Sequence, residues 1–167
     1  MATTKLKGNA VNLAGNEVNV GDKAPEITVV NCDGLADTVV GGAQGTKQLI
    51  VVVPSLDTPV CATETRNFNA KASSIDGVKV TVVSMDLPFA AGRFCSTEGI
   101  KDLTVASDFR NKDFANAYGV LIADGALAGV TCRAIFAVNE EGVVTYKEIV
   151  PEITEEPNYD DALAAVK

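Results

Sequence analysis

The sequence contains no histidine and no tryptophan, and its four cysteines stand far apart. Without histidine, the chain cannot build the Cys-His pair by which many enzymes activate a thiol. The closest cysteines, Cys32 and Cys61, are 29 positions apart, so there is no CxxC motif. Zinc sites usually take their cysteines in close pairs, and disulfide oxidoreductases of the CxxC type need that motif. The sequence therefore excludes a CxxC redox centre, and it predicts no metal site and no bound cofactor.

Long hydrophobic runs are also missing, although 47% of the residues are hydrophobic. No run approaches the roughly 18 apolar residues of a membrane-spanning helix. Residues 1–15 contain two early lysines but no continuous apolar segment of the kind found in secretory signals. Four cysteines are too sparse for a disulfide-stapled secreted domain. We therefore expect a cytoplasmic protein without a membrane partner, folded as a single domain over residues 1–167.

Positive charge is scarce, with 14 Lys and Arg against 22 Asp and Glu and a net charge of -8. No basic cluster forms a stripe that would neutralise phosphates, so nucleic acid is not expected as a partner. Residues 148–161 carry six acidic side chains and no basic one. This run is interpreted as a solvated surface rather than as an acidic docking face.

Apolar runs and helical patterns alternate along the chain, which predicts an α/β fold with a mixed sheet and helices on both faces. Residues 48–54 form a continuous β-branched run, typical of a strand buried on both faces. The predicted strands cover residues 25–30, 48–54, 77–85 and 103–107, with hairpins within residues 5–13 and 132–150. The predicted helices cover residues 58–74, 87–98, 110–119 and 158–167, and a loop contains Asp33-Gly34 and Gly41-Gly42.

The stretch VVVPSLDTPVCATE, residues 51–64, draws attention to Cys61. If Thr58 caps the helix, Pro59 takes the first helical position, where its missing N–H costs nothing. Cys61 then lies in the first turn, beside unpaired N–H groups and the positive end of the helix dipole, which favour a thiolate. The hydroxyl of Thr58 can also donate or accept a hydrogen bond beside the sulfur. The same residues also occur for capping alone, which is the alternative.

Two arginines are candidates for a cation beside this thiol. Arg133 precedes the apolar run AIFAV, at a strand entrance where an arginine must be paired or reach solvent. A guanidinium near Cys61 would stabilise the thiolate and hold a substrate oxygen. Arg66, in the helix that follows Cys61, is the second candidate.

Three segments together resemble one known family. PSLDTPVC, residues 54–61, fits the peroxiredoxin pattern of proline, three residues, threonine, two residues and cysteine. The match continues in DLPFAAGRFC, residues 86–95, and AYGVLIADG, residues 117–125, and it extends over essentially the whole chain. The sequence is similar to the bacterial thiol peroxidases, atypical two-cysteine peroxiredoxins. This resemblance implies a thioredoxin-like fold with a central mixed sheet, flanking helices and an N-terminal hairpin. It also implies a homodimer that reduces hydrogen peroxide and organic hydroperoxides at the expense of thioredoxin.

The resemblance assigns roles to five residues. Cys61 matches the peroxidatic cysteine, which becomes a sulfenic acid, and Cys95 matches the resolving cysteine, which forms an intrachain disulfide with it. Thr58 and Arg133 match the residues that orient the peroxide and stabilise the thiolate. Pro54 matches the proline that shields the site from water.

Disulfide formation requires two Cα atoms within about 7 Å, which a thiol locked in the first turn of a helix does not readily reach. We therefore predict that one or both helices around Cys61 and Cys95 unwind locally during the cycle. Phe89 and Phe94 flank Cys95 at a spacing that favours packing on the core; exposed near Cys61, they would instead favour organic hydroperoxides.

The other two cysteines match neither role. Cys132, adjacent to Arg133, is interpreted as an apolar filler on a strand, with a backup resolving or sensing thiol as the alternative. Cys32 lies in a loop-like segment. For the whole protein, two rival functions remain: a non-enzymatic redox sensor or chaperone that uses the same two cysteines, and a binding protein with inert cysteines.

Overall fold

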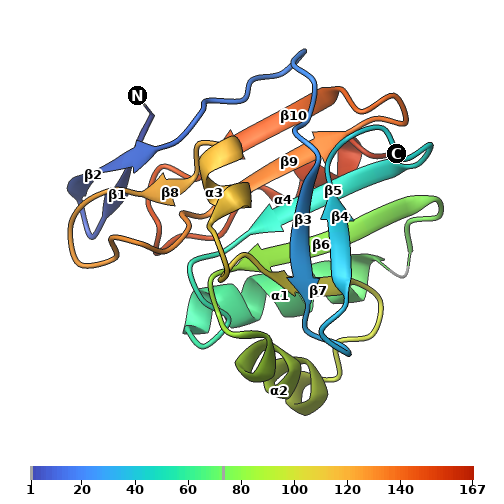
Figure 1. Cartoon of the computed structure of the whole chain (residues 1–167), viewed down its shortest axis with the longest axis horizontal. Coiled ribbons are helices and arrows are strands. Elements are labelled where there is room, and N and C mark those ends of the chain that lie inside the picture. Colours follow the sequence, from blue (N-terminus) through green and yellow to red (C-terminus); the bar gives the residue numbers. More distant parts are fainter. Residues whose placement is uncertain (1, 73) are drawn as a thin grey trace.

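A mixed seven-stranded sheet forms the centre of the computed structural model, which describes residues 2–72 and 74–167 (Figure 1). Its strand order is β10-β9-β5-β6-β7-β3-β4. The strands are β3 (Ile27–Asn31), β4 (Asp37–Val40), β5 (Lys47–Val52), β6 (Val78–Ser84), β7 (Thr104–Ser107), β9 (Ala134–Val138) and β10 (Val144–Ile149). Strands β5, β6 and β7 are parallel, whereas β9 and β3 are antiparallel to their neighbours β5 and β7.

Helices connect the parallel strands, as parallel pairing requires. Helix α1 links β5 to β6, and α2 links β6 to β7, so both helices begin at the carboxyl ends of neighbouring strands. The helices are α1 (Pro59–Ala72), α2 (Pro88–Glu98), α3 (Asp113–Ala117) and α4 (Tyr159–Ala164). Figure 1 shows α1 and α2 together on one side of the sheet.

The central strand β5 buries both of its faces. Leu49 and Val51 pack into one apolar cluster together with Phe68 of α1 and Ala162 of α4. Ile50 and Val52, which alternate with them, belong to a second cluster that includes Phe114 and Tyr118 at α3. Because side chains of a strand point alternately to opposite faces, the two clusters lie on opposite sides of the sheet. The predicted mixed sheet with helices on both faces is confirmed.

An antiparallel sheet of three strands contains the N-terminal hairpin. Its strands are β1 (Thr3–Leu6), β2 (Asn9–Ala14) and β8 (Leu121–Ile122). Lys7 and Gly8 turn the chain with positive φ angles of 50° and 83°, a conformation that glycine adopts without strain. The predicted hairpin is confirmed.

Two strands were not expected from the sequence. The predicted loop after β3 contains β4, which pairs with β3 at the edge of the sheet. Its four residues stand between Gly34 and Gly41, so turn signals outweighed the short apolar pattern. Strand β8 has only two residues, too few for any periodicity to reveal.

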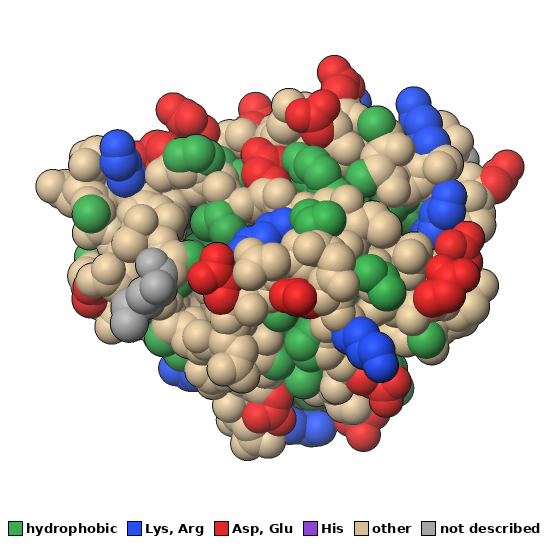
Figure 2. All heavy atoms as spheres, turned by 90° about the horizontal axis from the view of Figure 1, so that it is seen from above, with side chains coloured by type: hydrophobic (Ala, Val, Ile, Leu, Met, Phe, Trp, Pro, Cys, Tyr) green, Lys and Arg blue, Asp and Glu red, His purple; other side chains and the backbone are tan. Residues whose placement is uncertain are grey.

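Charged side chains are scattered over the face drawn in Figure 2, where basic groups stand apart from one another among acidic and uncharged ones. This distribution agrees with the excess of acidic residues in the sequence. Of the helices in the described ranges, none has the length and apolar character needed to cross a membrane.

Candidate active site

Cys61 is the third residue of α1 and is completely buried. The chain leaves β5 at Val52, passes the buried Pro54 and enters α1 at Pro59. Backbone N–H groups in the first turn of a helix have no partner within the helix, and they favour negative charge nearby. The local sequence therefore sets Cys61 in the first turn of α1, at the positive end of the helix dipole.

Arg133 lies immediately before β9 and directs its guanidinium at this sulfur. Its Nη2 donates to Cys61 Sγ over 3.3 Å, its Nη1 donates to Glu64 Oε2 over 2.5 Å, and its Nε donates to the carbonyl of Ile153 over 2.9 Å. The side chain is only 2% exposed, and that of Glu64 is fully buried. Three fixed bonds leave the guanidinium one orientation, so a cation is held against Cys61 away from solvent.

Glu64 lies one turn beyond Cys61, on the same side of α1. Burial raises the pKa of this carboxyl to about 7, against the opposing effect of Arg133. Its second oxygen, Oε1, has no hydrogen-bond partner among the described residues, which fits a costly ionised form. Burial lowers the pKa of Arg133, but the negative charges of Glu64 and Cys61 outweigh this and leave the pKa raised. Arg133 therefore stays a cation beside the sulfur.

Thr58 occupies the expected position before α1, and its carbonyl accepts a hydrogen bond from the N–H of Ala62 over 2.9 Å. Its hydroxyl, however, donates to the carbonyl of Ser55 over 2.8 Å, and its side chain is exposed. Within the described part of the chain, no hydrogen bond joins this hydroxyl to Cys61. Thr58 thus shapes the turn in front of the thiol and leaves an oxygen exposed there.

Asp86, which follows β6, holds the loop between β5 and α1 in place. Its carboxylate accepts bonds from Ser55 Oγ at 2.6 Å, from the N–H of Leu56 at 2.7 Å and from Ser84 Oγ at 2.8 Å. Ser107, at the end of β7, donates in turn to the carbonyl of Asp86. The ends of three parallel strands are therefore tied to the segment that carries Cys61.

Cys95 lies on α2, and no disulfide joins it to Cys61. Its Sγ is 3.9 Å from the Sγ of Cys32, which directly follows β3. All four cysteines are unpaired thiols in the described ranges. Cys132 is completely buried in the cluster on the other side of the sheet from Cys61, and burial raises its pKa to about 12.

Comparisons with known proteins agree with this geometry. The model of the family described as Redoxin matches residues 19–163. A thiol peroxidase of Aquifex aeolicus is 56% identical over 99% of this chain and 96% of its own length. One of Campylobacter jejuni is 56% identical over 95% of this chain and 89% of its own. The chain belongs to the Redoxin family, in its thiol peroxidase branch.

Solved structures place the fold of this redoxin among the peroxiredoxins. A peroxiredoxin-like protein from Aquifex aeolicus superposes with a TM-score of 0.96 at 55% identity, covering 99% of this chain and 96% of that one. A thiol peroxidase from Chromobacterium violaceum has a TM-score of 0.87 at 24% identity, covering 97% and 93%, and shows the same fold. The predicted thioredoxin-like fold and the predicted family are confirmed.

Sequence reasoning missed two residues of the site in this redoxin. Glu64 was signalled only by its spacing of three from Cys61, which places both on one helix face. Asp86 carried no signal, because its partners come from distant segments. The second candidate cation, Arg66, is partly exposed and pairs with Glu98 of α2 over 3.1 Å instead of reaching Cys61. No cluster of side chains suited to a metal ion occurs within the described ranges.

Proposed function

We propose that this redoxin is a thiol-dependent peroxidase whose peroxidatic residue is Cys61. The observation that carries the proposal is the 3.3 Å contact between Arg133 Nη2 and Cys61 Sγ at the start of α1, in a chain of the thiol peroxidase branch. A cation and a helix N-terminus act together on this sulfur, and only the thiolate is a strong nucleophile. The histidine that other cysteine enzymes use is not needed.

The reaction divides into two sulfur steps. The Cys61 thiolate attacks the terminal oxygen of the hydroperoxide, the O–O bond breaks, and the departing alkoxide takes a proton to leave as an alcohol or water. Cys61 is thereby oxidised to a sulfenic acid. The Cys95 thiol then attacks this sulfur, releases water and forms an intrachain disulfide. Arg133, and the oxygen of Thr58 in front of the thiol, support the orientation of the peroxide and the charge that develops on its oxygens.

Movement of α1 or α2 is part of this proposal. Cys61 is buried against Arg133, whereas the sulfur of Cys95 contacts that of Cys32. The two sulfurs must leave these partners before they can bond. The Arg66 to Glu98 ion pair is partly exposed and opposes such movement only weakly.

A shallow cavity of about 360 Å³ lies between α2 and the loop before α1. Leu56 and Phe94 contribute apolar side chains to its lining. Phe94 also packs against the core, as the sequence predicted, but Phe89 is 72% exposed and does not. Charged side chains, among them Asp57, Arg93 and Glu98, make up much of the remaining lining. The apolar part at Leu56 and Phe94 suits the alkyl group of an organic hydroperoxide, so we expect this class as substrate alongside hydrogen peroxide.

A thiol reductant must reduce the disulfide, and we propose that thioredoxin is this reductant. A homodimer is proposed on the resemblance to the thiol peroxidases, and a cytoplasmic location stays a prediction from the N-terminal sequence. The rival role as a redox sensor has no observation in its favour. It would be distinguished by rapid oxidation of Cys61 with little turnover.

The test measures consumption of an alkyl hydroperoxide with thioredoxin, thioredoxin reductase and NADPH. We expect no activity from Cys61→Ser. We expect Cys95→Ser to undergo one rapid oxidation without thioredoxin-linked turnover. Full turnover by Cys61→Ser would refute the proposal, because the first sulfur step would then occur elsewhere.

A further inference from the structure

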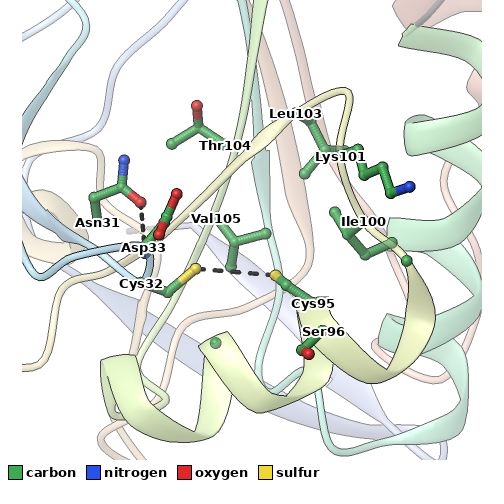
Figure 3. Close-up of a pocket in the computed structure, with 12 residues that line it drawn as sticks. Asn31, Cys32, Asp33, Cys95, Ser96, Ile100, Lys101, Leu103, Thr104 and Val105 are labelled. Atoms are coloured by element: carbon green, nitrogen blue, oxygen red, sulfur yellow. Dashed lines mark hydrogen bonds between the residues drawn. The ribbon is translucent and has the colours of Figure 1, made fainter.

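Two cysteines from distant segments of the chain meet beside α2. The Sγ atoms of Cys32 and Cys95 are 3.9 Å apart, and Figure 3 shows the two side chains pointing toward one another. An S–S bond is about 2.0 Å long, so a displacement of roughly 2 Å would join them. Neither the sequence pattern nor the resemblance to the thiol peroxidases gives Cys32 a function.

The pair opens onto a surface cavity of about 750 Å³. Cys32 and Cys95 both line this cavity and are each partly exposed. Asn31, Lys101 and Thr104 also line it (Figure 3). Cys61 does not line this cavity and is completely buried. A dithiol reductant must bring its own sulfur to the disulfide that it cleaves. Such a reductant has access to Cys32 and Cys95 in this conformation, but not to Cys61.

The pKa values of the two thiols are shifted in opposite directions. The hydrogen bond from Cys95 lowers the pKa of Cys32, against the opposing effects of burial and Asp33. The same hydrogen bond, together with burial, raises the pKa of Cys95. Either sulfur can donate in this contact, and the two shifts favour the proton on Cys95 in the reduced pair. A Cys95 sulfur in a disulfide has no S–H to donate, so attack by Cys32 on it is favoured by the short distance between the two sulfurs.

We propose that Cys32 is a third redox-active thiol. It exchanges with the Cys61–Cys95 disulfide to form a Cys32–Cys95 disulfide, which the reductant reaches from the cavity. The Cys32 thiolate attacks Cys95 Sγ, the bond between Cys61 and Cys95 breaks, and Cys61 leaves as a thiolate. One disulfide is exchanged for another, so the step needs no further oxidant or reductant. A dithiol reductant then cleaves the Cys32–Cys95 disulfide. This inference rests on the proposed function for the origin of the first disulfide.

The position of α2 favours this exchange. A Cβ atom at Gly92 would lie 3.2 Å from the carbonyl oxygen of Cys32, so the helix packs directly on the backbone that carries this cysteine. A Cys32–Cys95 disulfide therefore fits α2 close to where it lies, whereas bonding to Cys61 requires displacement. The leaving thiolate of Cys61 returns to the guanidinium of Arg133, which stabilises it as a leaving group.

Disulfide mapping tests the exchange because tryptic cleavage separates all four cysteines. Cys32, Cys61, Cys95 and Cys132 fall in the peptides 24–47, 48–66, 94–101 and 113–133, respectively. The reduced protein is mixed with an equimolar amount of hydrogen peroxide, quenched with acid and N-ethylmaleimide at increasing times, and digested without reduction. We expect a link between 48–66 and 94–101 to appear first and to be replaced by a link between 24–47 and 94–101. In Cys32→Ser, the first link should persist.

Cys132→Ala is the matched control, because it removes a cysteine that lies on the other face of the sheet. This variant should show the same disulfide exchange as the protein without substitutions. A lasting link between 48–66 and 94–101 in the intact sequence, with no link to 24–47 at any time, would overturn the proposal.

A second arm does not depend on peroxidase activity. Cys61→Ser is oxidised with glutathione disulfide, and the link between 24–47 and 94–101 should form within the chain. If both cysteines instead carry glutathione and never pair, the proposal is wrong even if the protein reduces peroxides. If the pair forms but the intact protein never oxidises Cys61 with peroxide, the proposed function is wrong and Cys32 remains a redox partner of Cys95.

Discussion

Cys61 and Glu64 lie one turn apart on α1, and both contact the guanidinium of Arg133. The arginine thus joins a thiol and a carboxyl that otherwise have little access to solvent. When Glu64 is ionised, it shares the positive charge of Arg133 with the Cys61 thiolate. When Glu64 is protonated, more of this charge is available to the sulfur. The protonation state of the buried Glu64 carboxyl is therefore coupled to the stability of the Cys61 thiolate.

Replacing Arg133 by methionine tests whether this cation activates Cys61. The change removes a charge-assisted hydrogen bond, so we expect the rate constant for oxidation of Cys61 by hydrogen peroxide to fall at least about tenfold. The rate is measured by rapid quenching with N-ethylmaleimide and mass analysis of the tryptic peptide that contains Cys61, which is 48–66, or 48–71 where Arg66 is replaced. Arg66→Met is the control, because Arg66 pairs with Glu98 instead. Equal slowing in both variants would show only a general effect of charge.

Glu64→Gln tests the coupling through stability. The pKa of Glu64 in the folded chain, about 7, lies above the ordinary value of 4.5, so between these values the folded state binds more protons than the unfolded state. Stability contributed by this proton is present at low pH and is lost as the pH rises toward 7. Glutamine cannot titrate, so the variant should lack this loss, which amounts to about 3 kcal/mol.

The measurement is urea unfolding, followed by circular dichroism because the chain has no tryptophan, at about pH 5 and about pH 8. The difference in the free energy of unfolding between Glu64→Gln and the parent isolates Glu64 from other titrating groups. Parallel pH profiles would mean that Glu64 stays ionised throughout and that Arg133 outweighs the cost of burial.

The local part of the site was predictable from the sequence. Thr58, Pro59 and Cys61 are close in the chain, and capping rules alone place the thiol in the first helical turn. Likewise, the β-branched run of β5 identified the central strand. The position of Arg133 beside Cys61 was a hypothesis from burial cost, and the structure provides the 3.3 Å contact.

Long-range partners were not predictable in this way. Cys32 and Cys95 are 63 positions apart and meet only because β3 is next to β7 in the sheet and α2 packs on β7. No periodicity within either segment encodes that adjacency. Asp86 is a similar case, since its carboxylate binds a loop 30 positions earlier. A single sequence specifies such contacts only through the complete strand order.

Asp86→Ala tests whether the loop before α1 has to be fixed for Cys61 to react. Removal of the carboxylate leaves the N–H of Leu56 and two hydroxyls without their acceptor, which should cost about 1–3 kcal/mol of stability. We also expect slower oxidation of Cys61 by hydrogen peroxide in the folded variant. Asp57→Ala, at an exposed neighbouring position, should change neither quantity. Unchanged oxidation in Asp86→Ala would limit Asp86 to a role in stability.

Hydrogen exchange tests whether α1 and α2 open during the cycle. Disulfide formation between Cys61 and Cys95 must separate Cys61 from Arg133 and Cys95 from Cys32. We therefore expect residues 58–66 and 88–98 to exchange faster in protein oxidised with peroxide than in reduced protein. Cys32→Ser should be used, so that the Cys61–Cys95 disulfide is not exchanged away. Strand β9, in the buried centre of the sheet, provides the control and should be equally protected in both states. Equal protection of both helices as well would mean that the disulfide forms without local unwinding.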